Sequence, residues 1–116
     1  MLTLREKRCL FTKLKALLIL WISHQPDWEV ASGEGYVALT DAADGDHDGP
    51  HKAGGAHYTG LAEDLLLYIK GEYVTDSKHP AWVMIGTRWE SLHPLCRWGG
   101  KWGDANHISL EHEGRA

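Results

Sequence analysis

Two short polar patterns in this sequence carry side chains suited to metal and acid–base chemistry. The first pairs His57 with Asp64 in an H-x6-D spacing, and the second is the D-x-x-H run from Asp104 to His107. Two imidazoles and one carboxylate form a common catalytic zinc set, which leaves a further position open for water. Zinc would lower the pKa of that water and polarise a carbonyl oxygen. Asp104 could then take a proton from the water and hand it to a leaving amine.

The segment from Leu61 to Ile69 must position the first pattern. It is a strongly apolar run, followed by the turn signal Lys70-Gly71 and by the β-formers of Glu72 to Thr75, and it therefore predicts a β-hairpin. Alternate side chains of a strand share a face, so Asp64 would lie among apolar side chains and Glu63 would face away. A buried carboxylate needs a charged partner, because an unpaired buried charge is costly. A metal ion would be such a partner.

The start of the chain predicts a helix that lies against the core. Thr3 and Glu6 have the T-x-x-E spacing of a capping box, and Pro26 ends the segment. Apolar residues recur at steps of four, three and four and form one predicted stripe: Leu10, Leu14, Leu17 and Trp21.

The remaining elements follow from similar local signals. A second helix is predicted from Pro80 to His93, because proline suits the first helical position and apolar residues follow at helical spacing. Trp28 to Leu39 predicts one or two short strands with a bend, and His107 to His112 predicts a last strand. The polar, glycine-rich stretch from Asp41 to Gly55 predicts a loop, and Trp98 to Gly103 a tight aromatic loop.

Length and composition limit the class of protein. A chain of 116 residues suits one domain, and 43% hydrophobic with 24% charged residues is ordinary for a soluble globular protein. The net charge of -4 disfavours a nucleic-acid partner, which normally meets a basic surface. The apolar run from Ala16 to Ile22 is too short to insert across a membrane, and no signal-peptide cleavage site follows it, so synthesis in the cytoplasm is expected. Cys9 and Cys96 are expected to be reduced thiols, with a disulfide between them as the alternative.

Spacing alone favours a simpler interpretation of the two polar patterns. His57 would be an ordinary loop histidine, Asp64 would pair with an arginine or lysine, and Asp104 would belong to a turn beside Asn106. The order of motifs along the chain favours the metal instead. These motifs are Ala56-His57, Gly60-Leu61-Ala62, Asp64, Trp98-Gly99-Gly100, and Asp104 to His107.

In this order and separation the motifs resemble those of the zinc D,D-carboxypeptidase and L-alanyl-D-glutamate peptidase family. That family carries S-x-H-x-x-G-x-A-x-D, then tryptophan-glycine-glycine, then D/E-x-x-H. Small phage endolysins of the family also resemble the flanking segments, so the likeness covers nearly the whole chain. The flanking segments are Leu4 to Lys7, Trp89 to Leu95, and Asn106 to Gly114.

The resemblance implies that His57, Asp64 and His107 bind Zn2+ and that Asp104 is the general base. It implies a single zinc peptidase domain over residues 1–116, with an α+β fold in which two main helices pack on a small, mostly antiparallel sheet, as in hedgehog and D,D-peptidase domains. The expected function is hydrolysis of an amide bond in peptidoglycan stem peptides by a phage or prophage lysis enzyme. Such a monomer would be made in the host cytoplasm and would reach the cell wall after the membrane is permeabilised.

Two departures from the family pattern concern substrate binding. The serine two residues before the first ligand is Gly55, and no arginine follows the Gly35-Tyr36-Val37 stretch, where the family often has one. Arg88 or Arg97 could replace it, although either could equally be a surface residue. The alternative function is therefore a non-catalytic metal- or peptidoglycan-binding structural module of the same fold. The intact Asp104 favours the enzyme.

The acidic stretch from Asp44 to Asp48 resembles part of a calcium loop, although no glutamate stands at the closing position, and a solvated turn is the competing interpretation. His51 is a candidate substrate contact or alternative ligand. His112 would point away from the site by strand parity. Trp98 and Trp102 either line a substrate groove or pack in the core.

Overall fold

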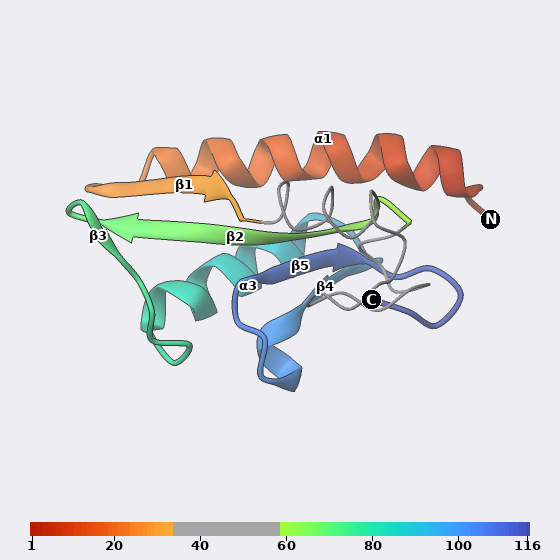
Figure 1. Ribbon diagram of the computed structural model, residues 1–116. Coiled ribbons are helices and arrows are strands. Elements are labelled where there is room, and N and C mark those ends of the chain that lie inside the picture. Colours follow the sequence, from red (N-terminus) through yellow and green to blue (C-terminus); the bar gives the residue numbers. More distant parts are fainter. Residues whose placement is uncertain (34–58) are drawn as a thin grey trace, which may run out of the picture.

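A computed structural model describes residues 1–33 and 59–116 (Figure 1). The elements in chain order are α1 (Leu4–Ser23), β1 (Trp28–Ser32), β2 (Ala62–Ile69), β3 (Glu72–Tyr73), α3 (Pro80–Leu92), β4 (Cys96–Trp98), the 3-10 helix η1 (Gly99–Trp102) and β5 (His107–Leu110). The predicted α+β class is confirmed, since within these ranges two α-helices accompany an antiparallel sheet.

The sheet is organised around β2. Its strand order is β1-β2-β5-β4, and every pairing is antiparallel. One edge of β2 pairs with β1. The other edge pairs with β5 over Ala62 to Asp64 and with β3 at Tyr68 and Ile69. The register places Asp64 directly opposite His107. Two motifs that lie far apart in the sequence are thereby brought onto neighbouring strands.

The predicted hairpin and second helix are both confirmed. Lys70 and Gly71 have φ values of 53° and 77°, and left-handed backbone at both central residues is the geometry of a two-residue hairpin turn. α3 begins with Pro80 in its first turn, and the ring of His79 accepts a hydrogen bond of 3.0 Å from the N–H of Ala81. Local turn and cap chemistry therefore sets both elements.

The buried face of α1 differs from the predicted stripe. The capping box is present, since Thr3 Oγ1 accepts from the N–H of Glu6 (3.1 Å) and Glu6 Oε1 accepts from the N–H of Thr3 (3.0 Å). Leu17, however, is 46% exposed. The prediction was wrong because α1 is apolar on more than one side, and both candidate stripes pass through Leu14. The observed buried residues are Lys7, Phe11, Leu14, Leu18 and Ile22.

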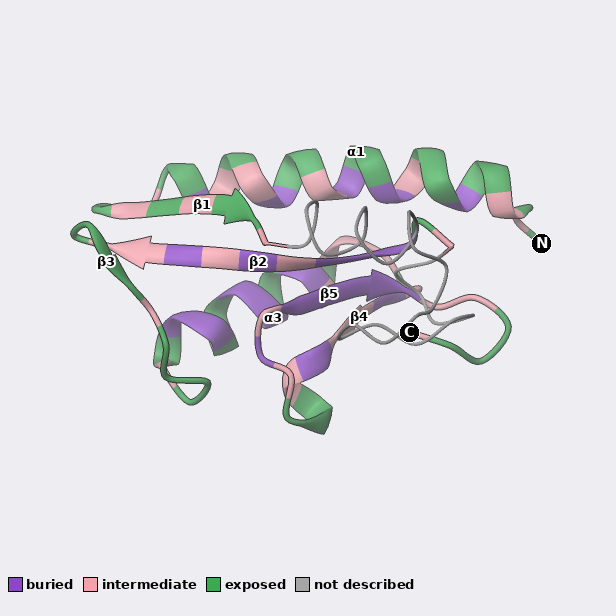
Figure 2. Ribbon diagram, in the orientation of Figure 1, coloured by how far each residue is buried: buried purple, intermediate pink, exposed green. Residues whose placement is uncertain are grey.

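Both helices pack on one face of the sheet and share a single core with it (Figure 2). Leu65 and Leu67 of β2 are fully buried in this core, and the ring of Phe11 in α1 meets Trp89 of α3 edge-on at 5.7 Å. Glu63 shares the core-facing side of β2 and forms an ion pair of 3.2 Å with Lys15 of α1. No helix in the described ranges is long and apolar enough to cross a membrane.

Candidate metal centre

Asp64, Asp104 and His107 lie together on the face of the sheet opposite the helices. Nδ1 of His107 is 3.4 Å from Oδ1 of Asp64 and 3.8 Å from Oδ2 of Asp104. One potential ligand atom from each residue lies within 4.8 Å of the others. Two of the predicted ligands and the predicted general base therefore form one cluster that could hold a metal ion.

Strand pairing itself brings the first two side chains together. The N–H of Leu65 donates to the carbonyl of Asn106 at 2.9 Å, which makes these residues a hydrogen-bonded pair. Hydrogen-bonded and non-hydrogen-bonded pairs alternate along an antiparallel ladder, so the next pair, Asp64 and His107, is of the non-hydrogen-bonded type. Side chains of such pairs are the closer ones and share a face. The register therefore fixes this half of the cluster.

A tight turn brings Asp104 to the same place. The N–H of Asp104 donates to the carbonyl of Gly99 at 2.8 Å, and the N–H of His107 donates to the carbonyl of Asp104 at 3.1 Å. A Cβ atom at Gly99 would lie 2.3 Å from the carbonyl oxygen of Asp104 and 2.6 Å from Cβ of His107. Only glycine fits there, which explains one glycine of the Trp-Gly-Gly motif physically.

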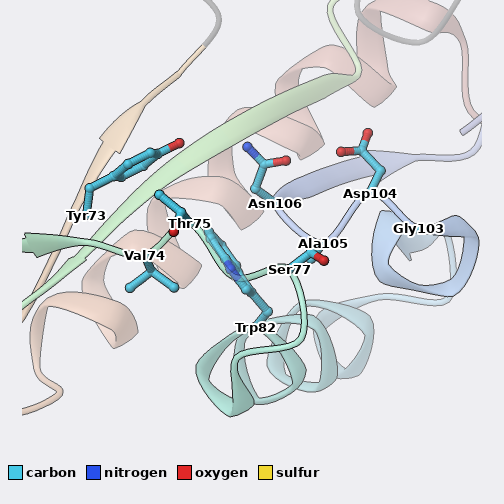
Figure 3. A pocket seen from close by; sticks show the side chains of 9 residues that line it. All are labelled: Tyr73, Val74, Thr75, Ser77, Trp82, Gly103, Asp104, Ala105 and Asn106. Atoms are coloured by element: carbon cyan, nitrogen blue, oxygen red, sulfur yellow. The ribbon is translucent and has the colours of Figure 1, made fainter.

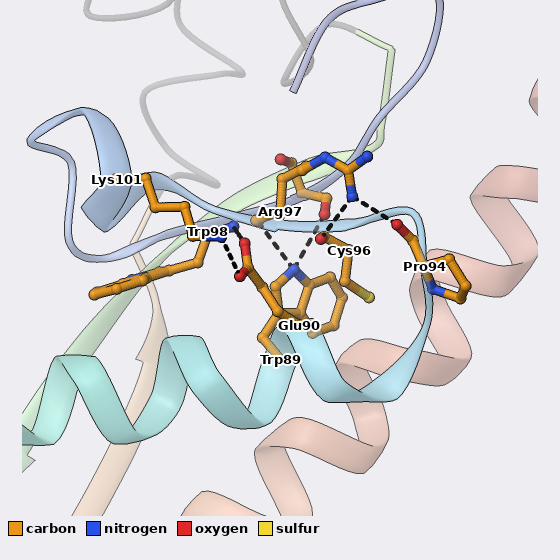
Figure 4. A network of polar contacts seen from close by, with 8 residues as sticks. Trp89, Glu90, Pro94, Cys96, Arg97, Trp98 and Lys101 are labelled. Atoms are coloured by element: carbon orange, nitrogen blue, oxygen red, sulfur yellow. Dashed lines mark hydrogen bonds and ion pairs between the residues drawn. The ribbon is translucent and has the colours of Figure 1, made fainter.

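A polar network ties this turn to α3 (Figure 4). The carboxylate of Glu90 accepts a hydrogen bond from the backbone N–H of Trp98 (3.0 Å) and forms an ion pair with Lys101 (2.6 Å). The indole N–H of Trp98 donates to the carbonyl of Ala105 at 2.6 Å. A Cβ atom at Gly86 would lie 2.1 Å from the Trp98 ring, so α3 approaches the indole closely. Trp98 packs against the core, which decides between its two predicted roles.

Exposure increases across the cluster. His107 is 4% exposed, whereas the side chains of Asp64 and Asp104 are 23% and 48% exposed. The ring of Trp102 meets the His107 ring edge-on at 5.6 Å and is itself 51% exposed. The imidazole is thus held by packing, while about half of the Asp104 side chain is accessible to solvent.

A groove of about 360 Å3 opens beside Asp104 (Figure 3). It lies between the segment that leaves β3 and the segment that enters β5. The side-chain amide of Asn106 in its wall donates to the carbonyl of Leu65 at 3.0 Å. Sequence reasoning missed this groove; Asn106, which stands inside the D-x-x-H run, was the one local signal. The lining residues are Tyr73, Val74, Thr75, Ser77, Trp82, Gly103, Asp104, Ala105 and Asn106.

Several predicted residues lie outside the described ranges. His57 is one of them, as are His51, Gly55 and the acidic stretch from Asp44 to Asp48. The stretch Gly35-Tyr36-Val37 lies outside them too.

The remaining candidates have contacts of their own. The ring of His112 lies 3.0 Å from Nζ of Lys7, so this histidine does point elsewhere. Arg97 donates to the carbonyl of Pro94 at 2.6 Å, and the guanidinium of Arg88 lies over the ring of Trp21 at 5.8 Å.

No protein-family model matches the chain, and no curated protein matches it at significant similarity. Two carboxylates and one imidazole suit divalent metals of borderline or hard character. Asp64, Asp104 and His107 could hold such an ion.

Proposed function

We propose that this protein is a zinc metallopeptidase that hydrolyses an amide bond in peptidoglycan stem peptides, as a phage or prophage lysis enzyme. The cluster of Asp64, Asp104 and His107 carries the proposal. It supports the proposal because these are the residues that the resemblance assigns to metal binding and catalysis. In this proposal His57 supplies a further ligand.

Zinc is the metal we favour, because mixed imidazole and carboxylate ligands are typical of catalytic zinc sites. When bound, zinc supplies Lewis-acid chemistry and lowers the pKa of water to near neutrality. Asp64 and His107 would hold it, since strand pairing fixes both side chains and His107 is buried. A rigid ligand pair limits the reorganisation needed when a substrate binds.

Asp104 would move the proton. A general base must meet both the attacking water and the leaving nitrogen, and a side chain 48% exposed at the edge of a groove can do so. The backbone N–H of Asp104 donates a hydrogen bond to the carbonyl of Gly99, and this bond holds the carboxylate beside His107 without burying the side chain in the core. The hydrogen-bonded loop thus orients the base and leaves it accessible.

The alternative is a non-catalytic metal- or peptidoglycan-binding structural module. One observation favours it: Asp104 lies 3.8 Å from Nδ1 of His107, close to the 3.4 Å of Asp64, so that both carboxylates could be ligands. Removing the Asp104 carboxylate separates the two functions. A base can be removed without loss of metal, whereas a ligand cannot.

In this proposal the substrate is the cell-wall peptide rather than nucleic acid. The protein acts as a monomer, without membrane insertion, after another agent has permeabilised the membrane. Calcium at the Asp44 to Asp48 stretch remains a secondary proposal. It predicts that a calcium-selective chelator lowers thermal stability or activity and that zinc does not restore either.

The test is mass spectrometry of purified peptidoglycan after incubation with the zinc-loaded protein. We expect release of stem-peptide fragments, and the fragment masses identify the bond. Asp104→Ala should abolish release and keep stoichiometric zinc, while Glu29→Ala, which removes an exposed carboxylate on β1, should behave as the wild type. Loss of zinc from Asp104→Ala would favour the structural module. His57→Ala with unchanged zinc and unchanged activity would refute the ligand assignment.

A further inference from the structure

The groove beside Asp104 lies where two strands separate along one edge of β2. β5 pairs with the first residues of β2 and β3 with its last two, and the segments next to these pairings form the two walls. Figure 3 shows Tyr73 and Thr75 on one side of the groove and Asp104 and Asn106 on the other. Its volume of about 360 Å3 is at the lower end of the roughly 300–1,000 Å3 found for small-ligand pockets. The groove can therefore hold a short segment of a peptide.

The chemistry of amide hydrolysis indicates which half of a cleaved peptide would lie in this groove. Water adds its oxygen to the carbonyl carbon, the carbon–nitrogen bond breaks, and the nitrogen gains a proton and leaves as an amine. If Asp104 delivers that proton, the nitrogen must come within about 2.6–3.2 Å of its carboxylate. The part of the substrate attached to this nitrogen then starts at Asp104, which lines the groove.

We infer that the groove binds the amine-bearing half of the cleaved peptide, the half on the C-terminal side of the cut; this rests on the proposed function. The walls suit such a segment, since Tyr73, Thr75 and Ser77, whose side chains carry hydroxyl groups, line the groove. The free amine is a cation at neutral pH, and the carboxylate of Asp104 in the groove lining attracts it. The other half, which ends in the new carboxylate, lies on the side of Asp64 and His107.

The inference can be tested without turnover. Two free-amine probes, D-isoglutamyl-L-lysine and D-alanine, and their N-acetylated forms are titrated into the zinc-loaded 116-residue protein by NMR. We expect at least one free-amine probe to bind about tenfold or more tightly than its acetylated form, because acetylation removes the charge-assisted hydrogen bond to Asp104. Ser77→Trp, which fills the groove, should weaken that binding by about tenfold or more. The matched control Thr87→Trp, at an exposed position of α3 outside the groove, should leave it unchanged.

A second readout covers the case in which Ser77→Trp does not fold. In the wild type, the free-amine probe should shift the NMR signals of the Asn106 side-chain amide and the Trp82 indole N–H. Equal binding of free and acetylated probes, or absence of these shifts, would overturn the inference. Cleavage of peptidoglycan without amine preference contradicts the groove inference alone. Amine binding in the groove without cleavage contradicts the proposed peptidase function alone.

Discussion

Replacing Gly99 with alanine is the most direct test of how the site is assembled. The added methyl would meet the carbonyl oxygen of Asp104 at 2.3 Å and Cβ of His107 at 2.6 Å. Neither atom is the end of a flexible side chain, so the turn from Gly99 to Asp104 and the start of β5 must move apart. The substitution therefore perturbs a predicted ligand and the predicted base together, although Gly99 itself has no reactive group.

The expected size follows from overpacking of a tight contact, which costs about 1–3 kcal/mol. For a chain of this length, roughly 4 °C of melting temperature corresponds to 1 kcal/mol. The melting temperature, measured by circular dichroism on metal-free protein, should therefore fall by roughly 4–12 °C. Zinc affinity, measured by competition with a chromogenic chelator, should fall about 10–100-fold, as is typical when the groups that orient metal ligands are disturbed.

Gly71→Ala is the matched control. Gly71 has φ of +77° and no atom within 4 Å of an added Cβ, so alanine there introduces backbone strain of about 1–2 kcal/mol without a clash. The turn lies at the end of β2 remote from Asp64, and zinc affinity should not change. A Gly99→Ala protein with the melting temperature and zinc affinity of the wild type would refute the account of the turn.

Two further predictions concern groups outside the site. Burial raises the pKa of the Cys96 thiol to about 12, whereas Cys9 is exposed. A thiol reagent at pH 8 should therefore modify one cysteine in the native protein and two in urea. Rapid modification of both cysteines in the native state would contradict this. The backbone hydrogen bond from Thr3 lowers the pKa of Glu6 below 4.5 in the folded state, so its stabilising effect is present above that pH and is lost as pH falls through the folded-state pKa. The stability difference between wild type and Glu6→Gln, measured by urea unfolding, should therefore shrink between pH 6 and pH 3, and a constant difference would argue against the capping role.

The elements that could be predicted from the sequence depend on local chemistry. The hairpin turn at Lys70-Gly71 and the capping box at Thr3 are each set within a few residues. The rotation of α1 could not be predicted in the same way, because its apolar residues allow two stripes and only contact with the rest of the core selects one. Phe11 against Trp89 is such a contact.

In the candidate site, too, some features could be predicted from local sequence and others could not. Strand parity places Asp64 and Glu63 on opposite faces, as predicted, but the prediction that Asp64 is the buried carboxylate was wrong. Glu63 is the buried one, at 6% exposure, and it pairs with Lys15, whereas the side chain of Asp64 is 23% exposed. The groove could not be predicted, because it depends on where β3 and β5 separate along β2. The bond from Glu90 to the N–H of Trp98 joins a helix to a strand, and no spacing in the sequence indicates it.

The two carboxylates of the cluster differ in how the fold holds them, and this difference is the physical basis for assigning them different roles. Asp64 belongs to a central strand and faces His107 across a non-hydrogen-bonded pair, so its position depends on the sheet. Asp104 belongs to a turn that depends on Gly99, and its side chain is twice as exposed, at 48% against 23%. A metal ligand benefits from a rigid position, whereas a base must exchange protons with water and substrate. The fold thus holds Asp64 through the sheet and Asp104 through a turn, and Asp104 is both the more exposed of the two and part of the groove lining.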